Sequence, residues 1–460
     1  ANNEAWSDWV TVTINEAVDL MVHTEATGNL ARWAGPATQY YTWAGGHTMD
    51  QNLTADGNLN GQIMTAKEIE VRSLLANVWQ ATLTTEPKNV FFDGTQGTKV
   101  ASADLCNGAN KWYWAANVLY VYSTSDPATA YVAPGIEASA RDYCIDLNSQ
   151  PYITLQDLTV EFANLYGIRI DGTGHIISGI TVQRVLATQN YDVGIFSWAA
   201  TSLAENIIIQ DNEASYNGLQ AGIDGGTVAP TGIEILGSHA TYGTIVQRNN
   251  VHHNYWGIEL DQGSTNTVVR FNNIHDNSYH GLLIDNSDNN QAYYNLIYNN
   301  ALGWGLRIWD AAAGTVTGTQ IYNNVFYGNK IGIAIEDEQT NLKVKNNILW
   351  NNNADSAAEE IALESGHTYT GLDINYNCYY RASGNYFDYG GANSNFADWK
   401  TATGQDANSV NADPLLVSSS DFHLQALSPC INAGVNVSLT YDYDGVTVSA
   451  PPEIGAYEKI

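Results

Sequence analysis

Four acidic residues in the middle of the sequence recur at related positions of a short repeated motif. Glu234, Glu259, Asp261 and Asp285 each follow the first aliphatic residue of a Gly–aliphatic–x–aliphatic motif by one or three positions. Glycoside hydrolysis needs two carboxylates about 5–5.5 Å apart for retention of configuration, or roughly 6.5–9.5 Å apart for inversion. If the fold stacks these positions, Glu259, Asp261 and Asp285 are the candidate catalytic residues. Glu234 is then a candidate substrate-binding residue.

Crowding would also divide the chemical roles among these carboxylates. Like charges in contact raise the pKa of at least one carboxyl group, which leaves a protonated acid beside an ionised partner. A single outward Asp or Glu is more often a residue that only solvates the surface. Four on adjacent repeats, with no lysine interleaved, favour a functional cluster, because unrelieved like-charge contacts destabilise a fold.

The element that must position these residues is a β-strand repeated along the chain. The motif occurs as Gly167-Ile168-Arg169-Ile170, Gly232-Ile233-Glu234-Ile235, Gly257-Ile258-Glu259-Leu260, Gly281-Leu282-Leu283-Ile284, Gly305-Leu306-Arg307-Ile308 and Gly332-Ile333-Ala334-Ile335. The last four glycines are 24, 24 and 27 residues apart. Aliphatic residues that alternate with other residues are typical of a strand and not of a helix. A second register of asparagines accompanies the first: Asn249-Asn250, Asn272-Asn273, Asn295, Asn323-Asn324 and Asn346-Asn347.

Short strands in units of this length predict a parallel β-solenoid, in which each unit forms one coil. Successive coils stack about 4.8 Å apart, so equivalent residues lie above one another. We therefore expect an inward stack of Ile168, Ile258, Leu282, Leu306 and Ile333, and a hydrogen-bonded ladder of asparagines in one turn. The residues that alternate with the aliphatic stack must point outward on one common face.

Several further residues border that expected face and are candidate substrate-binding residues. They are Arg169, Trp256, His280, Trp304, Arg307 and Trp309. Indole rings would stack on pyranose faces, while arginine and histidine would bond hydroxyl groups. Packing in a turn accounts equally well for Trp256 and Trp304. His252, His253 and His275 are expected in turns away from the face.

One interval of the repeat leaves the register open. Gly194 and Gly232 are 38 residues apart, which is too long for one coil. We expect Glu234 on the sheet and residues 217–231 in a loop beside the cleft. The alternative starts the coil at Gly222 and puts Asp224 on the face instead.

Composition restricts the partners. Eighteen Lys and Arg against 48 Asp and Glu give a net charge of −30, and 44% of residues are hydrophobic. Such a chain can bury a large core, but it offers no cation cluster for nucleic acid and no attraction to an anionic membrane. We expect a monomer that binds a polysaccharide or oligosaccharide.

Cysteine usage and the first residues bear on the compartment. Cys106 and Cys144 lie toward one end, and Cys378 and Cys430 toward the other. This even count fits one disulfide at each end of an exported protein, and free buried thiols are the alternative. Because Ala1 is not followed by a charged and then apolar leader, we expect that a signal peptide has been removed and that the protein is secreted.

The asparagine-rich coils resemble the right-handed parallel β-helix proteins, a superfamily of mostly secreted polysaccharide hydrolases, lyases and epimerases. The stretches around Trp112–Tyr122 and Gly135–Glu137 are also similar to bacterial members, as is the tail from Asp413 to Glu458. The resemblance covers about residues 90–460. It implies an all-β right-handed parallel β-helix in residues 91–460, with the clearest coils in 155–350 and an irregular closing segment in 355–460. Residues 1–90 are then an N-terminal cap or β-rich extension.

The scaffold by itself leaves the activity open, because one β-helix supports many chemistries. The first hypothesis is a glycoside hydrolase that needs no cofactor and acts on a neutral or weakly charged polysaccharide. The second is a Ca²⁺-dependent polysaccharide lyase or epimerase, in which Glu259, Asp261 and Asp285 bind the metal and Arg307 is the base. The third is a carbohydrate-binding adhesin without catalysis. No zinc-type spacing of His and Cys is present in the sequence,.

Overall fold

The computed structural model describes most of the chain. Within residues 1–76 it describes only the backbone of six strands, which end with β6 (Ala66–Ser73). Residues 77–459 are described apart from 173–175, 200–203, 220–229, 239–242, 301, 311–313, 353–358, 383 and 385. The chain forms two compact units, one of residues 1–86 with 90–137 and the other of residues 87–89 with 138–460.

The first unit contains a four-stranded sheet in the order β10-β11-β12-β7. These strands are β7 (Val78–Thr82), β10 (Thr98–Lys99), β11 (Lys111–Ala115) and β12 (Val118–Tyr122). β11, β12 and β7 pair antiparallel, and Trp112 of β11 is buried. This unit therefore differs in kind from the parallel repeat that follows it.

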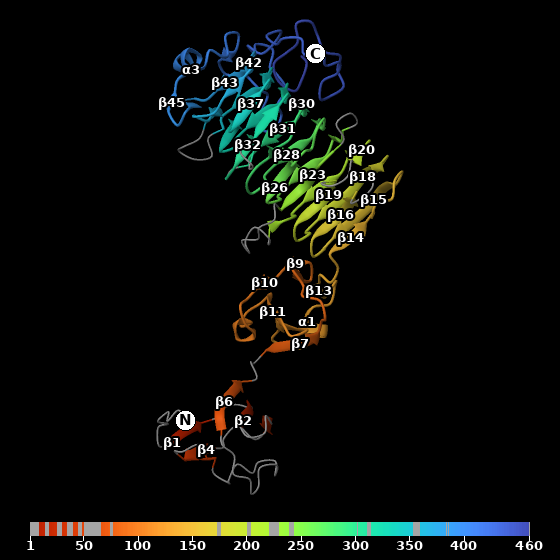
Figure 1. Ribbon diagram of the computed structural model, residues 1–460, viewed down its shortest axis with the longest axis vertical. Helices are drawn as coiled ribbons and strands as arrows, with labels where there is room; N and C mark the ends of the chain where they lie inside the picture. Colours follow the sequence, from red (N-terminus) through yellow and green to blue (C-terminus); the bar gives the residue numbers. More distant parts are fainter. Residues whose placement is uncertain are drawn as a thin grey trace. The chain divides into compact units, whose positions relative to one another are not determined.

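The second unit is a solenoid whose strands stack in parallel from β14 to β44 (Figure 1). The sheet that carries the acidic residues has eleven strands: β14 (Tyr143–Asp146), β16 (Tyr166–Asp171), β19 (Val193–Trp198), β23 (Thr231–Leu236), β26 (Trp256–Asp261), β29 (Leu282–Asp285), β32 (Trp304–Trp309), β36 (Ile331–Ile335), β40 (Ile361–Leu363), β44 (Phe387–Tyr389) and β45 (Asn393–Ser394). The sequence analysis placed the start of this domain at residue 91, whereas its first stacked strand begins at Tyr143.

A second sheet of 17 strands forms another wall of the solenoid. Its members are β15 (Thr154–Glu161), β18 (Thr181–Thr188), β21 (Ile208–Gln210), β22 (Glu213–Ser215), β24 (Ile245–Gln247), β25 (Asn250–His252), β27 (Val268–Arg270), β28 (Asn273–His275), β30 (Gln291–Tyr293), β31 (Leu296–Tyr298), β34 (Gln320–Tyr322), β35 (Val325–Tyr327), β38 (Lys343–Lys345), β39 (Ile348–Trp350), β42 (Asp373–Asn375), β43 (Cys378–Tyr380) and β46 (Val410–Asn411). A small third sheet consists of β33 (Thr315–Thr317), β37 (Glu338–Thr340) and β41 (Tyr369–Thr370).

The two predicted stacks are confirmed. The five predicted aliphatic residues are each 0% exposed and lie in one register of the eleven-stranded sheet: Ile168, Ile258, Leu282, Leu306 and Ile333. Ile195 and Ile233 continue the stack between Ile168 and Ile258. The glycine before each pair is required by close approach, since a Cβ on Gly257 would lie 2.3 Å from the carbonyl oxygen of Gly281.

Asparagines form two buried ladders inside the turns. In the predicted ladder, each side-chain Nδ2 donates to the Oδ1 of the next asparagine at 2.9–3.1 Å, through Asn212, Asn249, Asn272, Asn295, Asn324, Asn347 and Asn377. A second ladder, which the sequence analysis did not predict, includes Asn217, Asn254, Asn277 and Asn300. Both ladders bind backbone groups as well, so they fix the spacing of the coils,.

The C-terminal region departs from the irregular closing segment expected over 355–460. Strands β40, β42, β43 and β44 continue both sheets beyond residue 360. The helix α3 (Phe396–Thr403) then packs its buried Trp399 into the aliphatic core beside Phe387. The following tail packs on the outer surface of the 17-stranded sheet, where Phe422 contacts Tyr298 and Tyr327.

The structure settles the register that the sequence left open. Ile195 of β19 pairs with Ile233 of β23, which puts Glu234 on the sheet. Asp224 and most of the 217–231 interval lie outside the described residues.

All four cysteines are free thiols, so no disulfide joins them. The hydrogen bond with the neighbouring Cys430 thiol, followed by burial, raises the pKa of Cys378. In the part of the chain that the structure describes, no helix is both long and apolar enough to cross a membrane.

Candidate active site

Strand register places the predicted acidic residues on one surface. β23 pairs with β26 so that Glu234 lies beside Glu259, and Leu260 beside Ile284 puts Asp261 next to Asp285. One carboxylate oxygen from each of Glu259, Asp261 and Asp285 lies within 4.8 Å of the others. The structure therefore gathers the three candidate catalytic residues, with Glu234 on the adjacent strand.

These carboxyl groups are shielded from solvent although they point away from the aliphatic core. Glu259 is 3% exposed, and Glu234 and Asp285 are each 7% exposed. Burial, followed by the negative charges of their neighbours, holds the pKa values of Glu234 and Glu259 well above the ordinary glutamate value. Burial and then Asp285 raise the pKa of Asp261 to about 6. The site therefore holds protonated and ionised carboxyl groups side by side near neutral pH.

Three of these carboxyl groups have no basic side chain beside them among the described residues. Glu234, Glu259 and Asp261 have no Lys, Arg or His nitrogen within 4.0 Å there, while Thr231 Oγ1 donates a hydrogen bond to Glu259 Oε2 at 3.2 Å. The negative charge of these three groups is consequently reduced by proton uptake and not by ion pairing. Such an arrangement destabilises the fold and is typical of a functional site.

The sequence analysis missed one member of the cluster, Asp192. It is 2% exposed, its Oδ1 has no hydrogen-bond partner among the described residues, and its negative charge raises the pKa values of Glu234 and Glu259. Burial raises the pKa of Asp192 itself to about 7. Its position two residues before Gly194 was a usable signal, since the equivalent residues before Gly167 and Gly232 are Leu165 and Pro230. We call Asp192, Glu234, Glu259, Asp261 and Asp285 the acidic face.

Replacing Asp192 by Asn is expected to stabilise the protein in a pH-dependent way. The pKa of Asp192 rises from 3.8 to about 7 on folding, so the folded state binds more protons than the unfolded state between these values, and stability falls as pH rises through that window,. At about 1.4 kcal/mol per pKa unit, the penalty at pH 8 is up to about 4 kcal/mol, and at pH 4 it is small. Thermal unfolding should therefore show a rise in Tm for Asp192→Asn at pH 8 but little change at pH 4.

Asp157 provides the control for this prediction. It lies on the other sheet, where its exposed Oδ1 is 2.7 Å from Arg184 Nε, and the hydrogen bond from Arg184 lowers its pKa. Asp157→Asn should not be stabilising at pH 8. Equal Tm values of Asp192→Asn and the wild type at pH 8 would contradict this prediction, because they would show that burial of the ionised Asp192 carboxylate does not destabilise the protein.

An arginine stacked on aromatic rings borders each side of the acidic face. Arg307 lies 3.9 Å from the ring centroid of Trp309 and 4.3 Å from that of Trp304, and its Nη2 is 2.7 Å from Glu336 Oε2. On the other side, Arg169 lies 5.2 Å from the ring centroid of Trp198. Arg169 also pairs with Asp146 and Asp171. Both predicted arginines thus hold indole rings in place and are themselves neutralised.

His280 and Trp256 lie deeper than the sequence analysis expected. His280 is 2% exposed, stacks on Trp304 at 4.7 Å, and accepts a hydrogen bond at Nδ1 from the Trp304 backbone N–H at 3.3 Å. Burial and the charge of Arg307 lower its pKa to about 3, so the ring is neutral. Trp256 is half-buried, 5.6 Å from the His280 ring. His280 therefore supports the aromatic border through its ring and its Nδ1.

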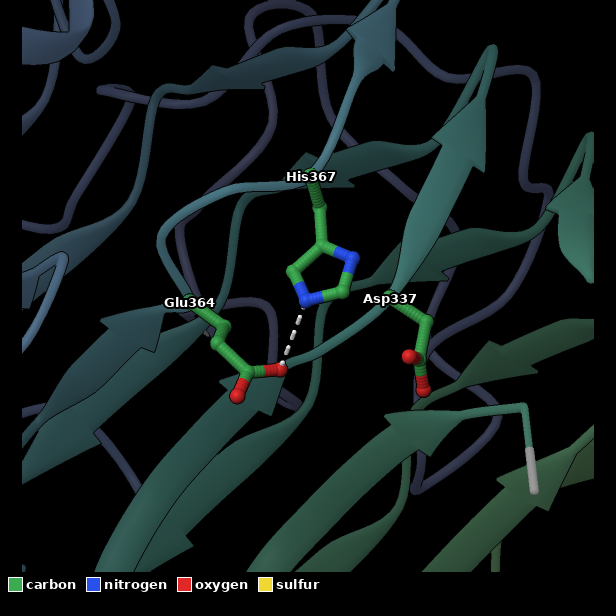
Figure 2. A group of neighbouring side chains, drawn as sticks. All are labelled: Asp337, Glu364 and His367. Atoms are coloured by element: carbon green, nitrogen blue, oxygen red, sulfur yellow. Dashed lines mark ion pairs between the residues drawn. The ribbon is translucent and has the colours of Figure 1, made fainter. Parts of the chain in front are cut away.

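Among the described residues, two groups of side chains have donors close enough for a metal ion. The first is Glu259, Asp261 and Asp285, an all-oxygen set that suits Ca²⁺,. The second is Asp337, Glu364 and His367, where His367 Nε2 is 3.3 Å from Glu364 Oε2 (Figure 2). This mixed set suits a transition metal better. Glu364 also lines an acidic cavity of about 330 Å³ with Glu336, Glu359 and Asp388.

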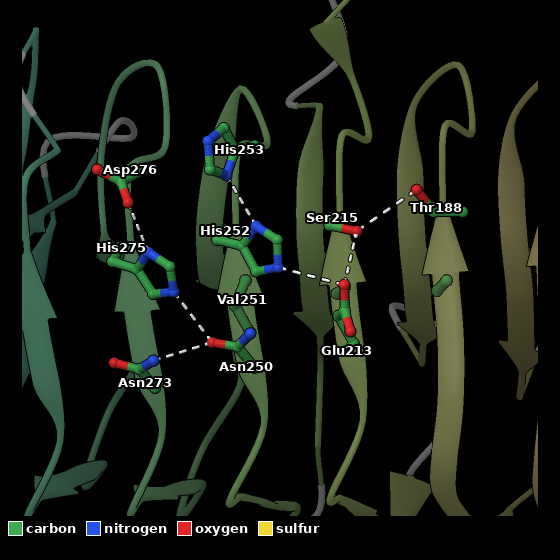
Figure 3. Close-up of polar contacts among 12 residues, drawn as sticks. Thr188, Glu213, Ser215, Asn250, Val251, His252, His253, Asn273, His275 and Asp276 are labelled. Carbon is green, nitrogen blue, oxygen red and sulfur yellow. Dashed lines mark hydrogen bonds and ion pairs between the residues drawn. The ribbon is translucent and has the colours of Figure 1, made fainter.

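His252, His253 and His275 lie away from the acidic face, as predicted, but His252 and His275 belong to strands and not to turns. His252 ends β25 and His275 ends β28, both in the 17-stranded sheet, and their rings stack at 5.0 Å (Figure 3). His252 Nε2 is 3.3 Å from Glu213 Oε1, and His253 Nδ1 is 2.8 Å from His252 Nδ1. These histidines bind one another and nearby polar groups.

Comparison with known proteins identifies the fold of the solenoid. Residues 227–397, which include the acidic residues from Glu234 to Asp285, match the family model of the right handed beta helix region. The solenoid is a right-handed parallel β-helix. The fold predicted from the sequence is therefore confirmed. A comparison with curated protein sequences gives no match.

Solved structures resemble the β-helix at low sequence identity. The structure of XylC with xylose has a TM-score of 0.56 and 11% identity, over 85% of this chain and 86% of that chain. A structure titled glycoside hydrolase has a TM-score of 0.43 and 9% identity, over 90% of this chain and 71% of that chain. The pectate lyase Pel9A has a TM-score of 0.38 and 14% identity, over 70% and 86%. The first likeness concerns the fold alone, and the other two are too distant to add to it.

Proposed function

We propose that the protein is a carbohydrate-active enzyme, specifically a glycoside hydrolase that cleaves a neutral or weakly charged polysaccharide at the acidic face. The observation that carries this proposal is the cluster of Glu259, Asp261 and Asp285, whose oxygens lie within 4.8 Å of one another. Carboxyl groups held this close and shielded from water cannot all be ionised. A protonated and an ionised carboxyl group side by side are the two groups that glycoside hydrolysis requires.

The surroundings of each carboxyl group suggest its role. Glu259 is nearly fully buried and its raised pKa keeps it protonated, so it is the general acid that protonates the leaving oxygen,. Asp261 is half-buried, with a pKa of about 6, and is mostly ionised at neutral pH. Asp261 and Asp285 then supply the nucleophile or the base that activates water. Glu234, protonated as well, donates a hydrogen bond to a sugar hydroxyl.

The borders of the acidic face suit a sugar polymer. Trp309 and Trp304 on one side and Trp198 on the other offer indole rings that are fixed by a stacked arginine. Rigid aromatic rings bind pyranose faces with little loss of conformational freedom. The adjacent acidic cavity lies on the same sheet beyond Arg307. None of the described residues that line it is Lys, Arg or His, which favours neutral sugar units. An extended groove along a solenoid accommodates several sugar units in line.

A Ca²⁺-dependent lyase or epimerase is the alternative, because Glu259, Asp261 and Asp285 would hold the cation, which would neutralise a uronate and acidify its C5 proton,. The base in that chemistry would be Arg307. Its guanidinium is bound to Glu336 at 2.7 Å and stacked against Trp309, so it is already engaged by two neighbouring side chains,. This engagement is the reason for preferring the hydrolase.

A panel of polysaccharides read by two signals tests the proposal. Hydrolysis of a neutral polymer is expected to release reducing ends without ultraviolet absorbance of an unsaturated product, and EDTA should leave the rate unchanged. A lyase would give both signals and lose them with EDTA. Reducing ends that carry the unsaturated absorbance, or silence on every polymer, would overturn the hydrolase.

A further inference from the structure

A glutamine ladder on the outer surface of the 17-stranded sheet ends at an arginine. Gln156, Gln183, Gln210 and Gln247 occupy one position on successive coils, and each Nε2 donates to the Oε1 of the previous glutamine at 2.7–2.9 Å. Arg270 takes the same position on the next coil and donates its Nε–H to Gln247 Oε1 at 2.8 Å. A fifth glutamine would have continued the ladder, so the ladder itself does not require the positive charge of Arg270.

The Arg270 guanidinium has neutral partners only. Its Nη1 donates to the Tyr293 hydroxyl at 2.9 Å, and it lies 5.5 Å from the Phe271 ring centroid. No described carboxylate lies within 4.0 Å of it, whereas Arg184 and Arg248 on the same sheet each pair with an aspartate at 2.7 Å. Of the five N–H groups in a guanidinium, three remain available to a ligand. An uncompensated cation in a chain of net charge −30 is a specific feature.

Arg270 lines a cavity on the outer surface of the 17-stranded sheet. The cavity measures about 750 Å³ and lies between the sheet, with Arg248, Arg270, Phe271 and Tyr293, and the tail segment 438–445. A second cavity of about 360 Å³ shares Arg248, Phe271 and Tyr443 with it and adds the amides of Asn250 and Asn273. Figure 3 shows these two amides joined beside His275. The larger volume is within the range of sites for ligands of sugar size.

The acidic residues of this cavity are already engaged. Asp442 is 2% exposed and accepts the backbone N–H groups of Asp444, Val446 and Glu458 at 2.7–3.0 Å. The Asp444 carboxylate is 2.9 Å from His423 Nε2. Arg270 is therefore the cation of this cavity that no described carboxylate neutralises, and Tyr441, which is 56% exposed, adds an aromatic surface at the same cavity.

We propose that this cavity binds a uronate unit of an acidic oligosaccharide, at a site separate from the acidic face. Arg270 receives the carboxylate through its remaining N–H groups, as guanidinium groups commonly do. The rings of Phe271, Tyr441 and Tyr443 pack against the pyranose, and Asn250 and Asn273 are within the adjoining space for hydroxyl groups. The site would hold a uronate-bearing polymer on the β-helix and does not depend on what the acidic face catalyses.

Calorimetric titration of the full chain with trigalacturonate tests the proposal. Arg270→Gln is expected to weaken binding at least tenfold, and it should fold because glutamine continues the ladder. Arg184→Gln is the matched control, since Arg184 lies on the same sheet but is paired with Asp157, and it should bind like the wild type. The methyl ester of trigalacturonate, which lacks the charge, should bind the wild type at least tenfold more weakly.

A further variant and a further ligand test whether the aromatic tail and the carboxylate are what the cavity recognises. Tyr441→Ala, a change in the exposed tail, should weaken binding independently of Arg270. Wild-type affinity in Arg270→Gln, or equal affinity for the acid and its ester, would overturn the site. Tighter binding of a sulfated disaccharide than of trigalacturonate would overturn the assignment to a carboxylate. Because binding is measured and not cleavage, an inactive acidic face would not affect the result.

Discussion

Replacing Asp285 by Asn or Glu259 by Gln is expected to lower kcat on a cleaved polysaccharide by about 10³-fold. Each amide keeps the shape of the carboxyl group but can neither give up a proton nor attack, and a single positioned acid or base contributes roughly 10²–10⁴-fold. The fold should survive, because Glu259→Gln replaces a protonated carboxyl group by a neutral amide of the same shape, and Asp285→Asn removes a negative charge from a group of carboxyl oxygens that lie within 4.8 Å of one another. Initial rates of reducing-end release, with Tm measured alongside, check both expectations.

The choice of leaving group distinguishes the acid role of Glu259 from the nucleophile or base role of Asp285. A 4-nitrophenyl glycoside needs little protonation as it departs, so Glu259→Gln should recover much of its rate on such a substrate. Asp285→Asn should not recover, because loss of the nucleophile or base affects every leaving group alike. Glu213→Gln serves as the control, since Glu213 lies on the other sheet near His252, and its kcat should stay within about twofold of wild type,.

If both Asp285→Asn and Glu259→Gln keep rates near wild type, the acidic face is not the catalytic centre. The acidic cavity with Glu336 and Glu364 would then be the next place to test. Recovery of Asp285→Asn on the nitrophenyl substrate, but not of Glu259→Gln, would reverse the two assignments.

The parity of the repeat explains how much of the site could be predicted from sequence. Because each coil repeats the same strand, the position of Glu259 relative to Ile258 fixed its face, and the pairing of Leu260 with Ile284 brought Asp261 to Asp285. The fold followed from the same periodicity. Asp192 was missed because it lies outside the alternating motif, at a place where periodicity assigns no side chain to the face.

Structural features that do not recur from one coil to the next could not be predicted in the same way. The burial of Glu259 and the stacking of Arg307 between Trp304 and Trp309 depend on rotamers and neighbouring side chains, which the motif does not specify. The continuation of coils past residue 360 was also missed, since β40 and β44 lack the glycine motif that marks the earlier strands. The pairing of Ala362 with Ala334 shows the same register without that signal.

Replacing Asn272 by Leu is expected to lower the free energy of unfolding by roughly 4–8 kcal/mol. Asn272 is 0% exposed; its Oδ1 accepts from the Asn249 N–H and Nδ2 at 3.0 Å, and its Nδ2 donates to Val246 O at 2.9 Å and Asn295 Oδ1 at 3.0 Å. Leucine has a similar volume but would remove all four of these buried bonds, at about 1–3 kcal/mol for each buried group that loses its partner. Asn249 Nδ2 and Asn295 Oδ1 would each keep one other bond, to Ile209 O and from the backbone N–H of residue 272. Guanidinium denaturation should show a much lower midpoint, or the variant should fail to fold.

Asn273→Leu is the matched control one residue away. Asn273 is only partly buried, and its Nδ2 donates to Asn250 Oδ1 at 2.9 Å on the outer surface, so its loss should change stability by about 1 kcal/mol or less,. Similar midpoints for the two variants would mean that the ladder is not what fixes the coils. A selective effect of Asn272 would connect the ladder to the site, because Asn272 lies in the chain between β26 and β29 and holds the coil spacing on which the contact of Asp261 with Asp285 depends.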